Sequence, residues 1–247
     1  MSPEQTQEVV RLRSLNLSPK QIARKLGLRP VQVTAIIRAH AESMEQNRLA
    51  ELGDTQTDLP RLEQCLINEG AIHRLLNSPS KPDGDNPDAA DLEEYDLRAG
   101  MANIFLARAN SGQYLFSGFL VDYWCLGVKD AISPQTMSKP KFDHLIQDTQ
   151  KGHGEIMRPI TLQQAQSIVF GAVNYAAGLG LKPHKDFEKA KTILGPKCDT
   201  LLELQFGRRG RPYYRSGITE NQQKVMQTLL KNVGEDNFDF DFAGPVS

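Results

Sequence analysis

The chain has few cysteines and no long apolar run. Its 247 residues include three cysteines, which are far apart and odd in number: Cys65, Cys125 and Cys198. This usage argues against a disulfide framework and fits a reducing compartment. No apolar stretch approaches the length of a membrane span, and residues 1–6 lack the basic start and apolar run of a signal peptide. The sequence therefore predicts a cytoplasmic protein without a membrane partner.

The sequence also lacks a strong net charge of either sign, and it lacks the common catalytic motifs. The net charge is −1 at pH 7, with 39% hydrophobic and 24% charged residues, as in an ordinary folded domain. A balanced charge argues against a protein whose whole surface coats nucleic acid. No C-x-x-C pair, H-E-x-x-H, phosphate-binding glycine loop or dinucleotide fingerprint is present. We therefore expect no metal and no cofactor.

What is present is a helix-turn-helix pattern in residues 18–38, SPKQIARKLGLRPVQVTAIIR. Ser18 and Gln21 match a capping box at the start of the first helix. Gly27 stands at the turn, where positive φ is easily adopted, and Pro30 stands near the start of the second helix, where its missing N–H is tolerated. Apolar side chains recur where two crossing helices bury them: Ile22, Ala23, Leu26, Leu28, Val33, Ile36 and Ile37.

Seven residues of this motif are predicted to contact DNA. Arg29 precedes the second helix, whose outward face carries Val31, Thr34 and Arg38. The arginines suit guanine or phosphate, and Val31 and the Thr34 methyl suit thymine methyls. The first helix adds three basic residues for backbone phosphates: Lys20, Arg24 and Lys25. Residues 1–40 hold seven Lys/Arg against two Glu, a local excess expected of a DNA-contacting module.

The segments LSPKQIARKLGL and VQVTAIIR resemble the helix-turn-helix units of homeodomain-like bacterial regulators, transposases and sigma-factor C-terminal regions. The resemblance covers about a sixth of the chain. It implies double-stranded DNA as partner and transcriptional regulation as function. Because one such unit buries little surface, we expect a homodimer on two half-sites. Units of this kind also dock on proteins, so an adaptor with a protein partner is an alternative.

The predicted fold class is α+β, with a three-helix helix-turn-helix followed by antiparallel hairpins packed against helices. The boundaries are residues 1–50 for the helix-turn-helix domain, 51–60 for a linker, 61–234 for the α+β domain and 235–247 for an acidic tail. Within the α+β domain, residues 77–96 hold three prolines and seven acidic residues against one lysine, which indicates a mobile insertion. This acidic insertion would be autoinhibitory if it competed with DNA for the basic unit.

Several elements of the larger domain are predicted individually. Strands are expected at EQCLINEG, MANIFLARA and YLFSGFLVD, the last two joined by a hairpin turn at residues 110–112. Residues 161–178 are expected to form a helix with a capping box at Thr161, and residues 185–194 a shorter one. LLELQFG and PYYRSG are expected to form a second hairpin. A last helix over residues 219–232 would be capped by Thr219, and the tail that follows would be loose or docked as a peptide.

Two segments hold candidate catalytic residues. FLVDYWCLGVKDA contains Asp122, Cys125 and Lys129 among large apolar groups, and PHKDF contains His184 and Asp186. An activated thiolate, or a lysine with a lowered pKa, would make the domain an enzyme of unknown reaction, directed to nucleic acid by the N-terminal unit. The competing interpretation is structural: a strand that leaves the sheet and turns at Gly127, with Cys125 buried. The sequence favours the structural interpretation.

The arginines of RRGRP allow two interpretations. An Arg-Gly-Arg-Pro core is similar to an AT-hook, which lies in a narrow A·T minor groove. Flanking strand-like segments instead favour a hairpin turn with exposed arginines. LVDYWCLGVKDA, IVFGAVNYAAGLGLKPHKDFEKAKTIL and LELQFGRRGRPYYRSG together resemble an uncharacterised bacterial domain family with an LVD-x-x-CLGVKD motif. The resemblance spans residues 64–217, implies a shared α+β fold, and argues against an AT-hook because the family's hairpin tip carries lysine and aspartate.

Overall fold

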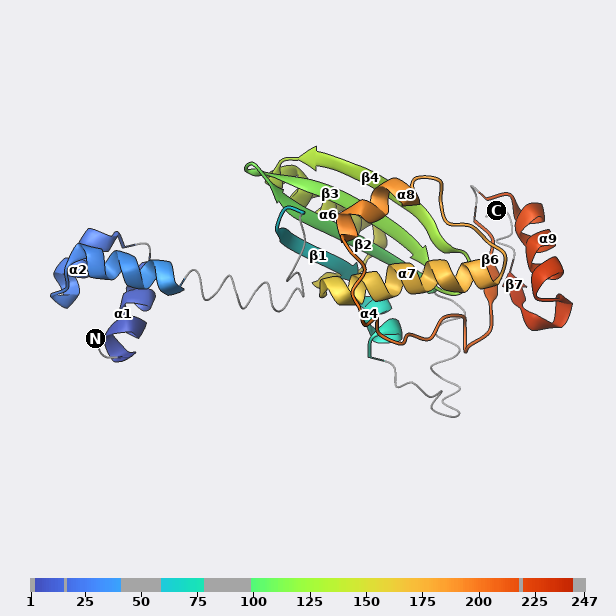
Figure 1. The fold of residues 1–247 in the computed structure, drawn as a ribbon, viewed down its shortest axis with the longest axis horizontal. Helices are drawn as coiled ribbons and strands as arrows, with labels where there is room; N and C mark the ends of the chain where they lie inside the picture. Colours follow the sequence, from blue (N-terminus) through green and yellow to red (C-terminus); the bar gives the residue numbers. More distant parts are fainter. Residues whose placement is uncertain (1–2, 16, 41–58, 78–98, 218–219, 242–247) are drawn as a thin grey trace. The chain divides into compact units, whose positions relative to one another are not determined.

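The structure is a computed structural model that describes residues 3–15, 17–40, 59–77, 99–217 and 220–241. The chain divides into two compact units, Met1–Glu51 and Leu52–Ser247, which are described separately below (Figure 1). Most of the predicted linker, nearly all of the acidic insertion, Thr219 and the last six residues lie outside the described residues.

The described residues of the N-terminal unit form three short helices. α1 spans Pro3–Ser14, α2 spans Pro19–Leu26, and the third covers residues 30–40. Their shared core is made of side chains at most 3% exposed: Val9, Leu12, Ile22, Ala23 and Val33. Three of the seven positions predicted to be buried belong to this core, and the other four are partly buried and pack against it: Leu26, Leu28, Ile36 and Ile37.

Local sequence signals set the ends of α2. The backbone N–H of Gln21 donates to the Ser18 hydroxyl, and the N–H of Ser18 donates to Gln21 Oε1 over 2.8 Å. This is the predicted capping box, which satisfies N–H groups that a helix start leaves unpaired. Gly27 ends the helix at φ 65°, in the left-handed region that glycine adopts without strain. The turn between α2 and the third helix is therefore encoded locally.

The larger unit is built on one antiparallel sheet with the strand order β4-β3-β2-β1-β5. Its strands are β1 (Leu62–Asn68), β2 (Met101–Asn110), β3 (Gln113–Asp122), β4 (Gly127–Met137) and β5 (Met157–Pro159). The predicted hairpin joins β2 to β3, with Asn110 opposite Gln113. Ser111 and Gly112 both have positive φ, as the tightest hairpin turns require. The α+β class expected from the sequence is confirmed.

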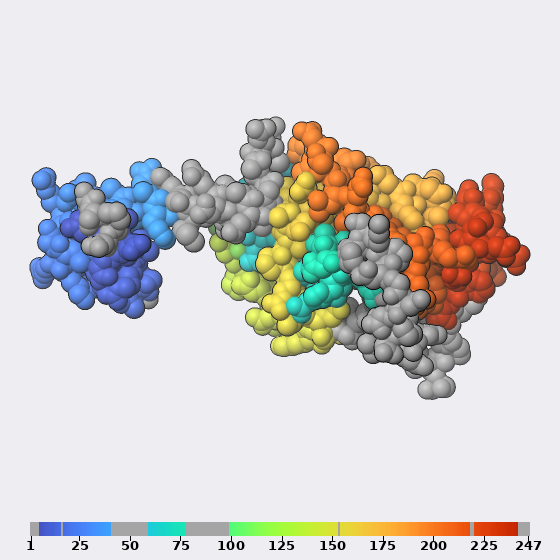
Figure 2. Space-filling view, turned by 90° about the horizontal axis from the view of Figure 1, so that it is seen from below, coloured from blue at the N-terminus to red at the C-terminus, as the bar shows by residue number. Residues whose placement is uncertain are grey.

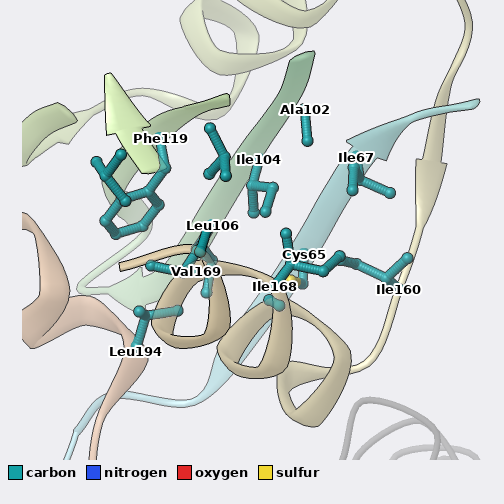
Figure 3. Packing of buried hydrophobic residues seen from close by; sticks show 14 of the residues in the cluster. Cys65, Ile67, Ala102, Ile104, Leu106, Phe119, Ile160, Ile168, Val169 and Leu194 are labelled. Carbon is teal, nitrogen blue, oxygen red and sulfur yellow. The ribbon is translucent and has the colours of Figure 1, made fainter. Parts of the chain in front are cut away.

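Helices cover both faces of this sheet. α7 (Leu162–Gly178) lies on one face, where Ile168 and Val169 contact Ile104 and Leu106 of the sheet (Figure 3). α6 (Lys139–His153) covers the other face with Phe142. Side chains of β2 alternate between the two cores, because successive strand residues point to opposite faces. The remaining helices on this framework are α4 (Glu69–Leu75), α8 (Phe187–Ala190) and the 3-10 turn η1 (Lys191–Leu194).

The sequence prediction of a second hairpin is wrong. Residues 201–206 form no strand, and only a single bridge joins Arg208 to Arg211. β6 (Tyr213–Arg215) pairs instead with β7 (Asp239–Asp241), in parallel. The glycines of the turn were visible in the sequence, but the partner strand lies beyond a whole helix and gave no local signal.

That helix, α9, spans Gln222–Asn232 and begins at a different cap from the one expected. Asn221 Oδ1 accepts a hydrogen bond of 3.0 Å from the backbone N–H of Lys224, so Asn221 is the N-cap. After α9 the chain forms a 3-10 turn, η2 (Glu235–Asn237), and then β7. The described part of the predicted acidic tail is therefore docked, the second of the two expected forms.

β4, α6 and β5 are among the elements that the sequence did not predict. β3 leaves the sheet after Asp122 and the chain turns back at Gly127, as expected, but it then continues as β4 in the same sheet. α6 and β5 follow β4. Ser133 and Pro134 lie within β4 and mask its strand character, but an edge strand tolerates a proline because one side needs no ladder bond.

Candidate functional site

All seven residues predicted to contact DNA have exposed side chains. Val31 is the most exposed large apolar residue described, at 79%. Val33, two positions later, is fully buried, so the helix over residues 30–40 separates an inner from an outer face as expected. The Thr34 hydroxyl donates to Pro30 O over 3.0 Å and is thus engaged by its own helix.

The start of the third helix is fixed by backbone contacts around Arg29. The N–H of Arg29 donates to Gln32 Oε1 over 3.0 Å, and Arg29 O accepts from the N–H groups of Gln32 and Val33. This reciprocal arrangement places Arg29 at the helix N-terminus. In a helix-turn-helix that end lies nearest to the bases.

The positive charge of the unit is concentrated on exposed side chains. Lys20 lies in the first turn of α2, and Arg24 and Lys25 in its last turn. Glu8, one of the two acidic residues among residues 1–40, accepts from Arg11 over 2.6 and 2.7 Å. This ion pair lies within α1, and Glu8 also interacts electrostatically with Lys25 of α2.

The candidate catalytic residues of the larger unit fall into separate groups. Asp122, at the end of β3, is 2% exposed. Its Oδ1 accepts from the N–H groups of Trp124 and Cys125, both over 2.9 Å, while its Oδ2 has no hydrogen-bond partner. Burial raises the pKa of Asp122 to about 6, against the opposing effects of these backbone bonds and of Lys129.

The Cys125 thiol lies within the same buried turn. It is fully buried beside Leu126, Tyr214 and Leu229. Burial first, and the Asp122 carboxylate second, raise the pKa of this thiol. A nucleophilic cysteine needs the opposite shift, so Cys125 has the properties of a structural residue.

Lys129 is directed away from the regular ladder by a β-bulge. Leu120 pairs with Asp130 and Val121 with Val128, which leaves Lys129 as the extra residue of β4. Its ammonium forms an ion pair with Glu220, which also accepts from the Gly217 N–H over 2.9 Å. This pair connects β4 to the segment before α9. Glu220 was missed in the sequence because it lies far along the chain.

His184 and Asp186 do come close together at the start of α8. His184 Nδ1 lies 3.6 Å from Asp130 Oδ1 and 3.8 Å from Asp186 Oδ2. The His184 N–H donates to Val128 O over 2.8 Å, which attaches this loop to β4. No hydrogen bond or ion pair of the described residues links His184 to Asp122 or Cys125. Across the described part of the chain, no three His, Cys, Asp or Glu side chains are grouped to hold a metal ion.

The arginines after β4 form a cluster with aromatic rings, which the sequence did not reveal. Arg208 lies 4.7 Å from the centre of the Tyr213 ring and 5.6 Å from that of Trp124. Arg215 lies 5.4 Å from the Trp124 ring and 5.8 Å from the Tyr213 ring. The prediction of exposed arginines concerned Arg208, Arg209 and Arg211. Arg209 and Arg211 are exposed, whereas Arg208 is half-buried against these rings.

No protein-family model, no curated protein and no solved structure matches this chain. The family resemblances of the helix-turn-helix motif and of residues 64–217 therefore stay predictions. Within the described residues, no helix combines the length and the apolar character that crossing a membrane requires.

Proposed function

We propose that this protein binds double-stranded DNA through its N-terminal unit, with the helix over residues 30–40 in the major groove. One observation carries the proposal: an exposed helix face with Val31, Thr34 and Arg38 next to exposed basic residues of α2. The core of the unit is complete without any of them. These side chains are therefore exposed to a partner, and their chemistry suits the edges of bases and phosphates.

The roles of the residues follow from their positions. Arg29 lies just before the helix, and Arg38 lies at the far end of its outward face. From these positions their guanidinium groups reach guanine or phosphate oxygens. Val31 and the Thr34 methyl group lie between them as apolar contacts for thymine methyls. Lys20, Arg24 and Lys25 hold the backbone and fix the register. We further propose a transcriptional regulator in the cytoplasm, which binds as a homodimer because a single unit buries too little surface for tight specific binding.

The first experiment is selection of bound fragments from sheared genomic DNA by the purified full chain at near-physiological salt. An enriched inverted repeat is the expected result, because two copies related by a twofold axis recognise two half-sites. Retention without any motif would mean phosphate contacts alone and would contradict a specific regulator. Absence of retention would contradict DNA binding and would favour docking of the unit on a protein.

Arg29→Ala and Arg38→Ala test the assigned face directly. Each is expected to weaken binding to the selected site by about 1–3 kcal/mol, or roughly 5- to 150-fold, if it contacts a base. Arg11→Ala is the matched control, because it removes one positive charge from the same unit at a side chain paired with Glu8 on α1. Wild-type affinity in both test variants, with unchanged circular dichroism, would contradict the assignment.

A further inference from the structure

The C-terminal residues 235–241, which we call the C-terminal strap, lie along the edge of β6. The N–H of Asp239 donates to Pro212 O over 2.9 Å, and the N–H of Ser216 donates to Asp241 O over 3.0 Å. In Figure 1 β7 lies beside β6, and Figure 2 shows the red C-terminal part of the chain at one end of the larger unit. The strap is thus a short strand added to a short strand.

The strap buries little side-chain surface. Phe238, 4% exposed, is its one buried side chain, and all three residues of β7 are exposed. Phe240 is 50% exposed. Gly234 precedes the strap at φ 84°, a conformation that only glycine adopts freely. Segments with so little burial open at a small fraction of the global stability.

The surface under the strap is fixed by its own contacts. The N–H of Tyr213 donates to Trp124 O over 3.2 Å, and the N–H of Gly207 donates to Tyr123 O over 2.9 Å. Tyr214 is fully buried. The first bond attaches β6, and the second the segment before it, to the turn after β3, and neither bond involves β7. The surface formed by β6 and the residues around it, which we call the acceptor, is therefore covered by a strap that buries little side-chain surface.

Three features of this acceptor define what it binds. The β6 edge offers backbone groups to an extended chain, as in peptide recognition by strand addition. An apolar site beside Tyr214 and Leu229 takes the Phe238 ring. Arg211 lies 3.2 Å from Asp239 Oδ2 and donates to Asp236 O over 2.8 Å, so a guanidinium faces the acidic side of the strap.

We propose that the β6 edge is a binding site for an extended segment of a partner protein in which a phenylalanine is followed by an aspartate. In the free protein the C-terminal strap occupies this site and the partner displaces it. The main-chain ladder and the apolar site for one aromatic ring favour a peptide over a nucleic acid, because a nucleic acid offers no matching backbone. The inference concerns the larger unit and does not depend on DNA binding.

The direct test is binding of a fluorescent peptide with the sequence of residues 233–241, VGEDNFDFD, to the full chain. In the variant Phe238→Ala the strap loses its anchor while the acceptor is unchanged. We expect this variant to bind the peptide at least tenfold more tightly than wild type, because wild type must first release its own strap. The same peptide with Phe238→Ala is the control ligand and is expected to bind neither protein.

Arg211→Gln, added to Phe238→Ala, tests the charged part of the site. It is expected to weaken peptide binding several-fold and to reduce its salt dependence, because the ion pair with Asp239 is lost. Absence of peptide binding to the folded Phe238→Ala variant would overturn the proposal. So would a gain of affinity for a single-stranded oligonucleotide in place of the peptide, which would identify the arginine cluster as a nucleic-acid site.

Hydrogen exchange on the unmodified protein provides a test that needs no variant. The Asp239 and Ser216 amides, which bond across the two segments, are expected to exchange much faster than amides of β2 and β3. Addition of excess peptide should speed exchange of the Asp239 amide, which leaves with the displaced strap, while the Ser216 amide stays protected by the bound peptide. Exchange of both amides only through global unfolding would show the strap to be an integral part of the fold and would overturn the proposal.

Discussion

At the scale of single residues, Asp122 is a buried carboxyl group whose ionisation is opposed by burial. Its folded-state pKa of about 6 lies above the value of 3.8 for an unperturbed aspartate. The native state therefore binds the extra proton between about pH 4 and 6, and the contribution of Asp122 to stability falls as pH rises through that window. Above this pH window the free energy of unfolding is lower by a constant amount, about 3 kcal/mol for a pKa that is raised by about two.

Asp122→Asn is expected to remove this pH dependence. The amide oxygen still accepts from the N–H groups of Trp124 and Cys125, and no charge is buried. The new amide N–H group lies where Oδ2 has no partner, at a cost of about 1–2 kcal/mol. We therefore expect the variant to be more stable by about 1–2 kcal/mol at pH 7 and less stable than wild type below pH 4, measured by urea unfolding.

Asp143→Asn is the control, because it removes one negative charge from an exposed position on α6. A difference from wild type that varies with pH equally in both variants would show that burial of Asp122 is not the cause.

Asp122 also illustrates what the sequence alone could not predict. Its place among apolar residues was visible, but its unpaired oxygen depends on a turn and on a core that only the folded chain assembles.

At the scale of elements, the contact between α7 and β4 depends on Gly127. A Cβ at this position would lie 2.8 Å from both Ala172 O and Ala176 Cβ of α7, and φ is 71°. Gly127→Ala therefore combines backbone strain with overpacking against a helix, and we expect a loss of about 3 kcal/mol in the free energy of unfolding.

Gly112→Ala is the matched control for this contact. Gly112 has φ 83° in the β2–β3 turn, and a Cβ there would meet no atom within 4 Å. It therefore reports the backbone strain alone, which costs about 1 kcal/mol. Equal losses in the two variants, by chemical denaturation at one pH, would show that α7 does not approach β4 as closely as described.

The elements that the sequence predicted are those with signals close along the chain. The capping boxes at Ser18 and Thr161 and the turn at Ser111 depend on residues within four positions of one another. The β6–β7 pairing, the bulge at Lys129 and the ion pair with Glu220 each join distant segments. Their energies depend on which surfaces meet in the folded unit, and no local pattern contains that information.

At the scale of the whole molecule, a net charge of −1 coexists with a local excess of positive charge in residues 1–40. The proposed DNA affinity must therefore come from a small part of the chain and a small number of phosphate contacts. Counterion release makes the logarithm of the binding constant fall linearly with the logarithm of salt concentration, by about 0.9 for each phosphate neutralised. A protein that touched DNA with its whole surface would show a much steeper dependence.

Lys25→Ala and Val31→Ala separate the two kinds of contact. Lys25→Ala removes a charge from the exposed face of α2 and is expected to reduce the salt slope by about 0.9 while sequence preference stays the same. Val31→Ala removes apolar contact area without charge, so the slope should stay constant while the preference for thymine relaxes. Titrations of each variant over a range of salt, on the selected site and on a site with deoxyuridine for thymine, measure both quantities. The opposite result would be a change of the salt dependence in Val31→Ala and a change of the preference for thymine in Lys25→Ala. That result would contradict the assignment of Val31 to base contact and of Lys25 to phosphate contact.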